Sequence, residues 1–298
     1  MLFEEKHRSF FLRLANYLAM LFLLLCSTAG ISFAQLTAVE NEMGAISFDR
    51  VAPLIKELSK SGAYLKSADV NAQLSATLNA KIKIAAIKPL KKELLGKEIY
   101  TQLKQSTLIL ISNGLRATAV VLDENGTILT NYHVLEMFGD SLRKNNQPMF
   151  AMTSDGIFYP VSQILACSKV NDLAIVKLGG LGKEKLDAIP IGDTVIEGTD
   201  VYVMGHPAHI TYFFSKGIVA RNFIRNPSNQ KDNEDFRMAV TADYSLGMSG
   251  GPIVDANGNL IGLVSSAVAL YGNPQQKANP QMSFKNAVPV IALKKIIQ

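Results

Sequence analysis

The sequence has no tryptophan, little cysteine and little charge. Its 298 residues include two cysteines, Cys26 and Cys167, and 18% charged residues. Two cysteines in a chain of this length exclude a disulfide-rich scaffold, so a hydrophobic core must stabilise the fold. The apolar content of 48% excludes a disordered chain.

The sequence also lacks a block of basic residues. The formal net charge of +5 is mild for this length, and the lysines fall on candidate helix faces such as "KPLKKELLGKE" at 88–98. We therefore expect no nucleic-acid partner.

The amino-terminal segment has the pattern of a signal peptide. Lys6, Arg8 and Arg13 precede an apolar run at 15–26, and the small residues Ser32 and Ala34 follow it. This order predicts a signal peptide over 1–34, cleavage after Ala34 and export. The alternative is an uncleaved membrane anchor over 14–33, in which case only this segment contacts the membrane.

After cleavage Cys167 remains alone, so no intramolecular disulfide can form. We expect Cys167 to be a small buried apolar residue.

Residues 35–94 are predicted to be a helical extension. Val51, Leu54, Ile55 and Leu58 recur at helical spacing. Pro89 suits the start of a second helix that continues past residue 100. The alternating segment at 81–87 could be a strand instead.

From about residue 107 the pattern changes to short β-branched and aromatic runs separated by turns. Asn-Gly pairs at 125–126 and 257–258 indicate hairpins. These features predict an antiparallel barrel or sandwich. A terminal helix should follow Pro289.

Three polar residues border these strands, and together they suggest acyl transfer. His133 follows "ILTNY", Asp172 precedes "LAIVKL", and Ser249 lies in "GMSGGP". The last motif alone predicts only a turn. A serine nucleophile needs an imidazole to take its proton and a carboxylate to orient that imidazole, and this set supplies both.

The segments "ILTNYHVLE", "VNDLAIVKL" and "LGMSGGPIVDANGNLIGLVS" resemble the signature segments of trypsin-like serine proteases of the HtrA/Deg type. The likeness covers residues 95–298. It implies a mainly β, chymotrypsin-like fold of two six-stranded antiparallel β-barrels, preceded by the helical N-terminal extension 35–94. The residues after Ser249 suffice only to finish the second barrel, so we expect no PDZ domain.

The resemblance implies that His133 is the general base, that Asp172 orients it and that Ser249 is the nucleophile. The backbone N–H groups of Gly247 and Ser249 would form the oxyanion hole. It implies an exported serine endopeptidase, periplasmic or secreted, that acts on protein or peptide substrates without a cofactor or metal. The alternative is an inactive binding or chaperone module on the same fold. The complete triad favours the enzyme, and oligomerisation is left open.

Met248 departs from the family pattern, which has Asn or Asp there. It excludes activation through a salt bridge at this position and leaves open what orders the oxyanion loop. Asp243 precedes Ser249 by the spacing at which trypsin has a carboxylate that binds the Lys or Arg side chain of its substrate. The alternative is that Asp243 is a turn residue. Ser265 and Ser266 are expected on the pocket wall or on the edge that pairs with substrate.

His206 and His209 form an H-x-x-H pair. Zinc binding is disfavoured, because Pro207 argues against a helix and no third ligand is nearby in the sequence.

Overall fold

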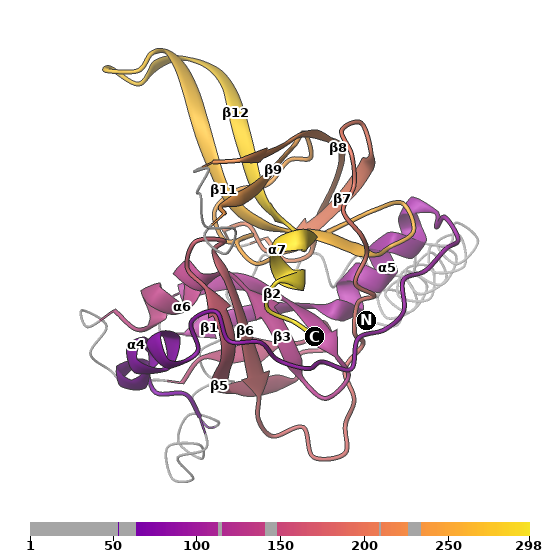
Figure 1. The fold of residues 1–298 in the computed structure, drawn as a ribbon, viewed down its shortest axis with the longest axis vertical. Coiled ribbons are helices and arrows are strands. Elements are labelled where there is room, and N and C mark those ends of the chain that lie inside the picture. Colours follow the sequence, from indigo (N-terminus) through magenta and orange to yellow (C-terminus); the bar gives the residue numbers. More distant parts are fainter. Residues whose placement is uncertain (1–52, 54–63, 113–114, 141–147, 209, 226–233) are drawn as a thin grey trace, which may run out of the picture. The chain divides into compact units, whose positions relative to one another are not determined.

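A computed structural model describes residues 53, 64–112, 115–140, 148–208, 210–225 and 234–298. These residues form two closed antiparallel barrels of six strands each, with short helices around them (Figure 1). The predicted mainly β fold with two barrels is therefore confirmed. The predicted signal peptide at 1–34 and the helical pattern at 51–58 lie outside the described residues, apart from residue 53.

The first barrel has the strand order β1-β2-β3-β6-β5-β4 and closes where β4 pairs with β1. The predicted Asn-Gly hairpin joins β2 to β3. There the Asp123 carboxylate accepts hydrogen bonds from the N–H groups of Asn125 and Thr127, at 3.0 and 3.1 Å. The strands are β1 Thr107–Ser112, β2 Leu115–Asp123, β3 Thr127–Thr130, β4 Phe150–Met152, β5 Phe158–Ser168 and β6 Leu173–Leu178.

The second barrel has the order β10-β11-β12-β9-β8-β7 and closes where β10 pairs with β7. Its Asn-Gly turn joins β10 to β11 in the same way, with the Asp255 carboxylate accepting from Asn257 and Asn259, both at 2.9 Å. The strands are β7 Asp200–Gly205, β8 Phe213–Ile224, β9 Phe236–Val240, β10 Pro252–Val254, β11 Leu260–Asn273 and β12 Ala278–Pro289.

The helices lie around these barrels. They are α4 Ser67–Ala76, α5 Gly96–Ser106, α6 Tyr132–Phe138 and α7 Val290–Lys294. The helix predicted after Pro289 is α7. None of the helices in the described ranges is both long and apolar enough to cross a bilayer.

The helix expected to start at Pro89 instead begins at Gly96, so that prediction is wrong. The preceding residues are held by the β10–β11 turn: the Leu90 N–H donates to Asn259 Oδ1 at 2.7 Å, and the Leu94 N–H donates to the Ala256 carbonyl at 2.9 Å. These tertiary hydrogen bonds outweigh the local helix preference. The helix then starts where Glu98 Oε2 accepts from the Leu95 N–H at 2.7 Å.

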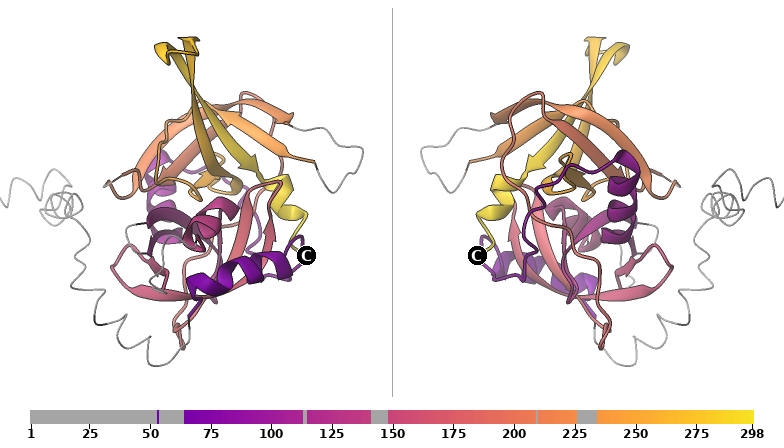
Figure 2. Two further views of the ribbon diagram at one scale, coloured as in Figure 1. Left: turned by 90° about the vertical axis from the view of Figure 1, so that its left-hand side faces the viewer. Right: turned by 90° about the vertical axis from the view of Figure 1, so that its right-hand side faces the viewer.

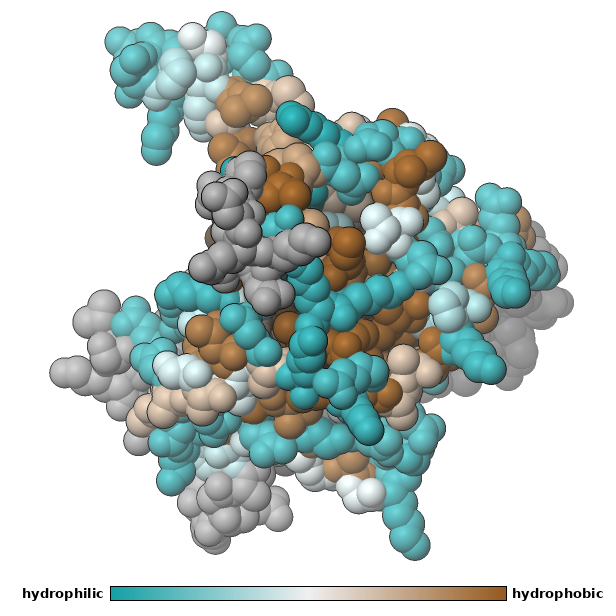
Figure 3. Space-filling view, in the orientation of Figure 1, coloured by the Kyte–Doolittle hydropathy of each residue, from teal (hydrophilic) through white to brown (hydrophobic). Residues whose placement is uncertain are grey.

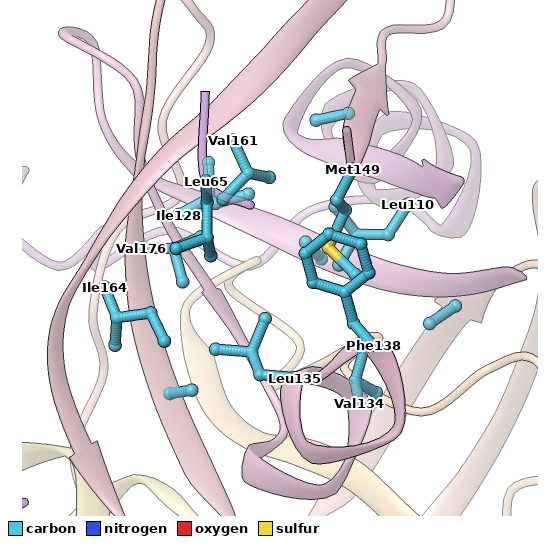
Figure 4. Close-up of a cluster of buried hydrophobic side chains, with 14 of the residues drawn as sticks. Leu65, Leu110, Ile128, Val134, Leu135, Phe138, Met149, Val161, Ile164 and Val176 are labelled. Carbon is cyan, nitrogen blue, oxygen red and sulfur yellow. The ribbon is translucent and has the colours of Figure 1, made fainter. Parts of the chain in front are cut away.

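The core of the first barrel extends into α6. Val134, Leu135 and Phe138 of α6 are buried in the same cluster as the strand residues Leu110 and Ile128 (Figure 4). Burying side chains of this size stabilises the docked helix by roughly 1.5–3 kcal/mol each. The helix is therefore firmly attached to the barrel, and so is its second residue, His133.

Candidate active site

His133 and Asp172 form a close pair at the end of the first barrel. His133 lies in the first turn of α6, and Asp172 lies in the turn between β5 and β6. The Asp172 carboxylate oxygens are 3.0 and 2.9 Å from His133 Nδ1, and Oδ1 also accepts the His133 backbone N–H at 3.0 Å. Because an ionised carboxylate only accepts, Nδ1 carries the proton and Nε2 is left as the basic nitrogen.

Several hydrogen bonds hold Asp172 in place. Its φ of 57° is a left-handed conformation, which aspartate tolerates better than most residues. The Asn131 side-chain amide donates to the Asp172 carbonyl at 2.9 Å, and the Ser265 hydroxyl donates to Oδ2 at 2.7 Å. Burial would raise the pKa of Asp172, but its hydrogen bonds and charge interaction with His133, together with the Ser265 hydroxyl, lower the pKa below its ordinary value. The carboxylate therefore stays ionised.

Ser249 comes from the second barrel, in the loop that leads into β10. It shares a cavity of about 610 Å³ with His133, Asp172, Gly247 and Ser265. The Ser249 hydroxyl donates to the Ser265 carbonyl at 3.3 Å. No hydrogen bond joins the described side chains of Ser249 and His133, and in proteases such a contact commonly tightens only when substrate is bound.

Two backbone N–H groups in the Ser249 loop have no backbone acceptor in the described part of the chain. The Leu246 carbonyl accepts from the Ala208 N–H at 3.0 Å. In a trans peptide the next N–H points the opposite way, so the Gly247 N–H faces away from Ala208. Among the described residues, neither the Gly247 nor the Ser249 N–H donates to another backbone group. Two such neighbouring donors are the arrangement that stabilises an oxyanion.

Thr118 of β2 holds this loop from the first barrel. Its N–H donates to the Ser249 carbonyl at 2.9 Å, and its hydroxyl donates to the Gly247 carbonyl at 2.9 Å. An added Cβ at Gly250 would lie 2.0 Å from the Thr118 carbonyl oxygen. The loop therefore packs directly against the first barrel, and only glycine fits at that contact.

Met248 anchors the same loop in the second barrel. Its side chain is fully buried in the core of that barrel, in one cluster with Val203, Val264 and Met238. It packs over Gly205, where an added Cβ would lie 3.0 Å from the Met248 Cβ and Cγ atoms. The buried Met248 side chain thus orders the loop. The sequence alone left open what orders it.

A buried arginine, which the sequence analysis missed, supports the Asp172 turn. Arg237 of β9 is only 4% exposed and donates to the carbonyls of Val170 and Asn171 at 3.1 and 3.3 Å. Its charge is balanced by Asp235 at 2.7 Å, which also pairs with Arg225 at 2.6 Å. The sequence signal that could have revealed this arginine is the pair Asp235 and Arg237, two residues apart in the apolar segment "DFRMAV". Charged side chains in a barrel strand are buried only when they are paired.

We expect Arg237→Met to lower the free energy of unfolding by about 3 kcal/mol or more, because the buried Asp235 loses its buried partner and the carbonyls of Val170, Asn171 and Phe236 lose a donor. Arg225→Met is the matched control. Arg225 pairs with the same carboxylate but its side chain is 55% exposed, so its loss should cost less than about 1 kcal/mol. Urea unfolding of both variants measures the difference. Equal losses would contradict the structural role of Arg237.

The structure does not bring Asp243 into the cavity. Its side chain is 78% exposed and pairs with Lys285 at 2.9 Å, and it is absent from the cavity lining. The cavity wall is formed instead by Tyr244, which is buried and donates to the Ser266 carbonyl at 3.4 Å. Ser266 itself lines the cavity, as does Ser265.

His206 and Cys167 are buried, and neither lines the cavity. His206 Nδ1 accepts from the Tyr212 N–H at 3.0 Å, and burial lowers the pKa of His206 to about 3. His209 lies outside the described residues. Within the described ranges no group of three or more His, Cys, Asp or Glu side chains could hold a metal ion. Cys167 is a buried free thiol in the core of the first barrel.

The geometry agrees with what the chain resembles. Residues 117–263 match the family model described as a trypsin-like peptidase domain. This match, with the double barrel, defines the chain as carrying a trypsin-like (chymotrypsin-fold) peptidase domain. Within that class the chain is similar to serine proteases of the HtrA/Deg type.

Two similar proteins illustrate the likeness to the HtrA/Deg type. A probable periplasmic DegP-like serine endoprotease of Chlamydia trachomatis is 26% identical over 187 residues, which are 62% of this chain and 33% of that protein. An HtrA-like serine protease of Staphylococcus aureus is 30% identical over 183 residues, 57% of this chain and 21% of that protein. The chain thus spans a third or less of the length of these relatives.

Solved structures show the same fold. The crystal structure of Deg5 superposes with a TM-score of 0.52 at 20% identity, covering 68% of this chain and 95% of that one. The MamO protease domain of Magnetospirillum magneticum superposes with a TM-score of 0.51 at 20% identity, covering 67% and 99%.

Proposed function

We propose that this chain is a serine endopeptidase that hydrolyses peptide bonds of protein substrates, with residues 95–298 as its protease domain. The observation that carries the proposal is the shared cavity, which is lined by the His133–Asp172 pair, by Ser249 and by Gly247. The N–H groups of Gly247 and Ser249 have no backbone acceptor among the described residues. The family match and the serine endoprotease relatives support it.

Each group has a defined role in this mechanism. His133 Nε2 takes the Ser249 hydroxyl proton as the oxygen attacks the scissile carbonyl carbon, and Asp172 stabilises the imidazolium that forms. The Gly247 and Ser249 N–H groups bind the oxyanion. His133 then gives the proton to the leaving amine, which leaves an acyl group on Ser249. Water, deprotonated by the same imidazole, hydrolyses this ester and restores the serine.

We also propose that the protein is exported. The charged, apolar and small-residue order of residues 1–34 supports export, and the Chlamydia relative is described as periplasmic. Mass spectrometry of the protein purified from a native envelope fraction tests this, and a mature chain beginning at Gln35 is the expected result.

The activity is tested by labelling the purified chain with a fluorophosphonate and by digesting an unfolded protein. We expect covalent labelling at Ser249 and cleavage of the substrate. Ser249→Ala should abolish both. Ser245→Ala, which removes another cavity hydroxyl, should leave labelling intact. A folded wild-type chain that is neither labelled nor active would instead indicate a binding module on a protease fold.

A further inference from the structure

Arg116 lines the cavity but has no anionic partner in the described part of the chain. It lies near the start of β2, and its Nε and Nη2 atoms are buried without a hydrogen-bond acceptor. Burial lowers the pKa of Arg116, and no described carboxylate raises it again. Hydrophilic residues cover much of the face in Figure 3, where water solvates them. The buried guanidinium atoms lack that solvation, and an unpaired buried charge is costly.

The other charged side chains that line the described cavity wall already have partners. The pairs are Lys169–Glu136, His133–Asp172, Arg225–Asp235 and Arg237–Asp235. Arg116 is therefore the one charged side chain of this wall whose donors are left for a ligand, and a ligand for a guanidinium carries a negative charge.

Arg116 borders the nucleophile from the first barrel. The N–H of Thr118, two residues further along β2, donates to the Ser249 carbonyl at 2.9 Å. The two barrels lie against each other in both views of Figure 2. Burial, and then the charge of Arg116, lower the pKa of His206 to about 3. The guanidinium is therefore close to His206, whose carbonyl oxygen lies against Gly247.

The residue after Arg116 borders the imidazole. Ala117 and Val134, which follows His133, are buried in one core cluster, and both line the cavity. In the proposed mechanism His133 gives its proton to the leaving amine, so the departing part of the substrate lies beside the imidazole. We therefore place Arg116 on the side of the leaving group.

We propose that Arg116 binds a carboxylate on the part of the substrate that follows the scissile bond. This inference rests on the proposed function. The carboxylate belongs to an aspartate or glutamate side chain, or it is the terminal carboxylate of a short leaving segment. A guanidinium binds either through two parallel N–H···O hydrogen bonds. A neutral substrate leaves the buried donors unpaired, so the enzyme should select acidic leaving segments.

Acyl transfer tests the leaving side of the site by itself. An ester substrate acylates Ser249 of the full-length chain, and added dipeptides then compete with water. The dipeptide amine attacks the acyl carbonyl carbon and loses a proton to His133, which passes a proton to the departing Ser249 oxygen. An amide bond thus replaces the ester bond. The ratio of aminolysis to hydrolysis measures how well the dipeptide binds beside the acyl group.

Three matched pairs of dipeptides distinguish the sources of the carboxylate. Glu-Ala amide is compared with Gln-Ala amide, Ala-Glu amide with Ala-Gln amide, and free Ala-Ala with its amide. We expect at least one acidic dipeptide to be transferred at least about tenfold better than its neutral mate. Equal transfer within all three pairs would overturn the proposal.

Matched variants assign the preference to Arg116. Arg116→Met should bring the ratio of acidic to neutral transfer to about one. Arg116→Lys should keep part of the preference, because it retains the charge without the two parallel donors. Arg225→Met removes an arginine of the same wall that is already paired, and it should leave the ratio intact. A preference that persists in Arg116→Met, or that Arg225→Met reduces equally, would contradict the assignment.

Unfolding in urea distinguishes a ligand site from a structural arginine. Arg116→Met removes an unpaired buried charge, so we expect the urea midpoint not to fall. A midpoint lowered as far as in Arg237→Met would show that Arg116 supports the fold, and it would overturn the proposal.

The two proposals fail in different ways. Fluorophosphonate labelling of the wild-type chain with equal transfer within every pair would sink the Arg116 site alone. A chain that is neither labelled nor acylated would contradict the protease. Fluorescence anisotropy of labelled dipeptides on the Ser249→Ala chain then decides the carboxylate site. Acidic dipeptides that bind at least about tenfold tighter would retain it, and equal binding would overturn it.

Discussion

Asp172→Asn is expected to lower kcat by about 10⁴-fold while the chain stays folded. In the native pair both carboxylate oxygens accept from His133 Nδ1, at 3.0 and 2.9 Å. An asparagine amide can present its N–H₂ group to Nδ1 and so favours the opposite tautomer, in which Nε2 carries the proton. The imidazole can then no longer take the Ser249 proton. Steady-state hydrolysis of a peptide substrate, with melting curves to show folding, measures this loss.

Ser265→Ala is the control for this variant. It removes one 2.7 Å hydrogen bond to Asp172 but leaves the carboxylate and the imidazole tautomer unchanged. We expect it to lower kcat by about tenfold or less, since one such hydrogen bond contributes about 1.5 kcal/mol. If Asp172→Asn retained a tenth of the wild-type kcat, Asp172 would not have the orienting role assigned to it.

Gly247→Ala is expected to lower kcat by about 10²–10³-fold by displacing an oxyanion donor. Gly247 has a φ of 97°, which disfavours any side chain. An added Cβ would also lie 2.5 Å from the His206 carbonyl oxygen. The backbone must therefore move, and the Gly247 N–H moves with it. Burst kinetics with an ester substrate measure acylation directly and show whether this step is slowed.

Gly198→Ala separates backbone strain from catalysis. Gly198 has a similar φ of 85°, but an added Cβ there meets nothing within 4 Å. This variant should therefore carry the conformational cost, of about 1 kcal/mol in unfolding free energy, with an unchanged acylation rate. Equal kinetic losses in both variants would show that strain alone accounts for the Gly247 effect.

The barrel fold could be predicted because its signals are local. The alternating runs from residue 107 and the two Asn-Gly turns each specify a structure within a few residues, and the structure has strands and hairpins there. The gathering of His133, Asp172 and Ser249 at one cavity followed from three motifs in order, once their resemblance to a family was recognised.

The rest depends on contacts between distant segments, which periodicity does not encode. The start of α5 is set by hydrogen bonds from Leu90 and Leu94 to the β10–β11 turn. Asp243 is turned out of the cavity and paired with Lys285 of β12. For Met248 the sequence excluded a salt bridge but did not predict the buried packing of the side chain. Its packing partners come from several strands. Each of these features is decided by tertiary packing.

The proposed active site is divided between the two barrels, and Thr118 links the halves. The proposed base and its carboxylate belong to the first barrel, the proposed nucleophile belongs to the second, and Thr118 donates hydrogen bonds to the loop around Ser249 across the junction. Catalytic activity therefore requires the two barrels to remain docked. A slight separation would abolish activity while both barrels kept their own cores. On heating, activity should therefore disappear earlier than the β-sheet signal in circular dichroism.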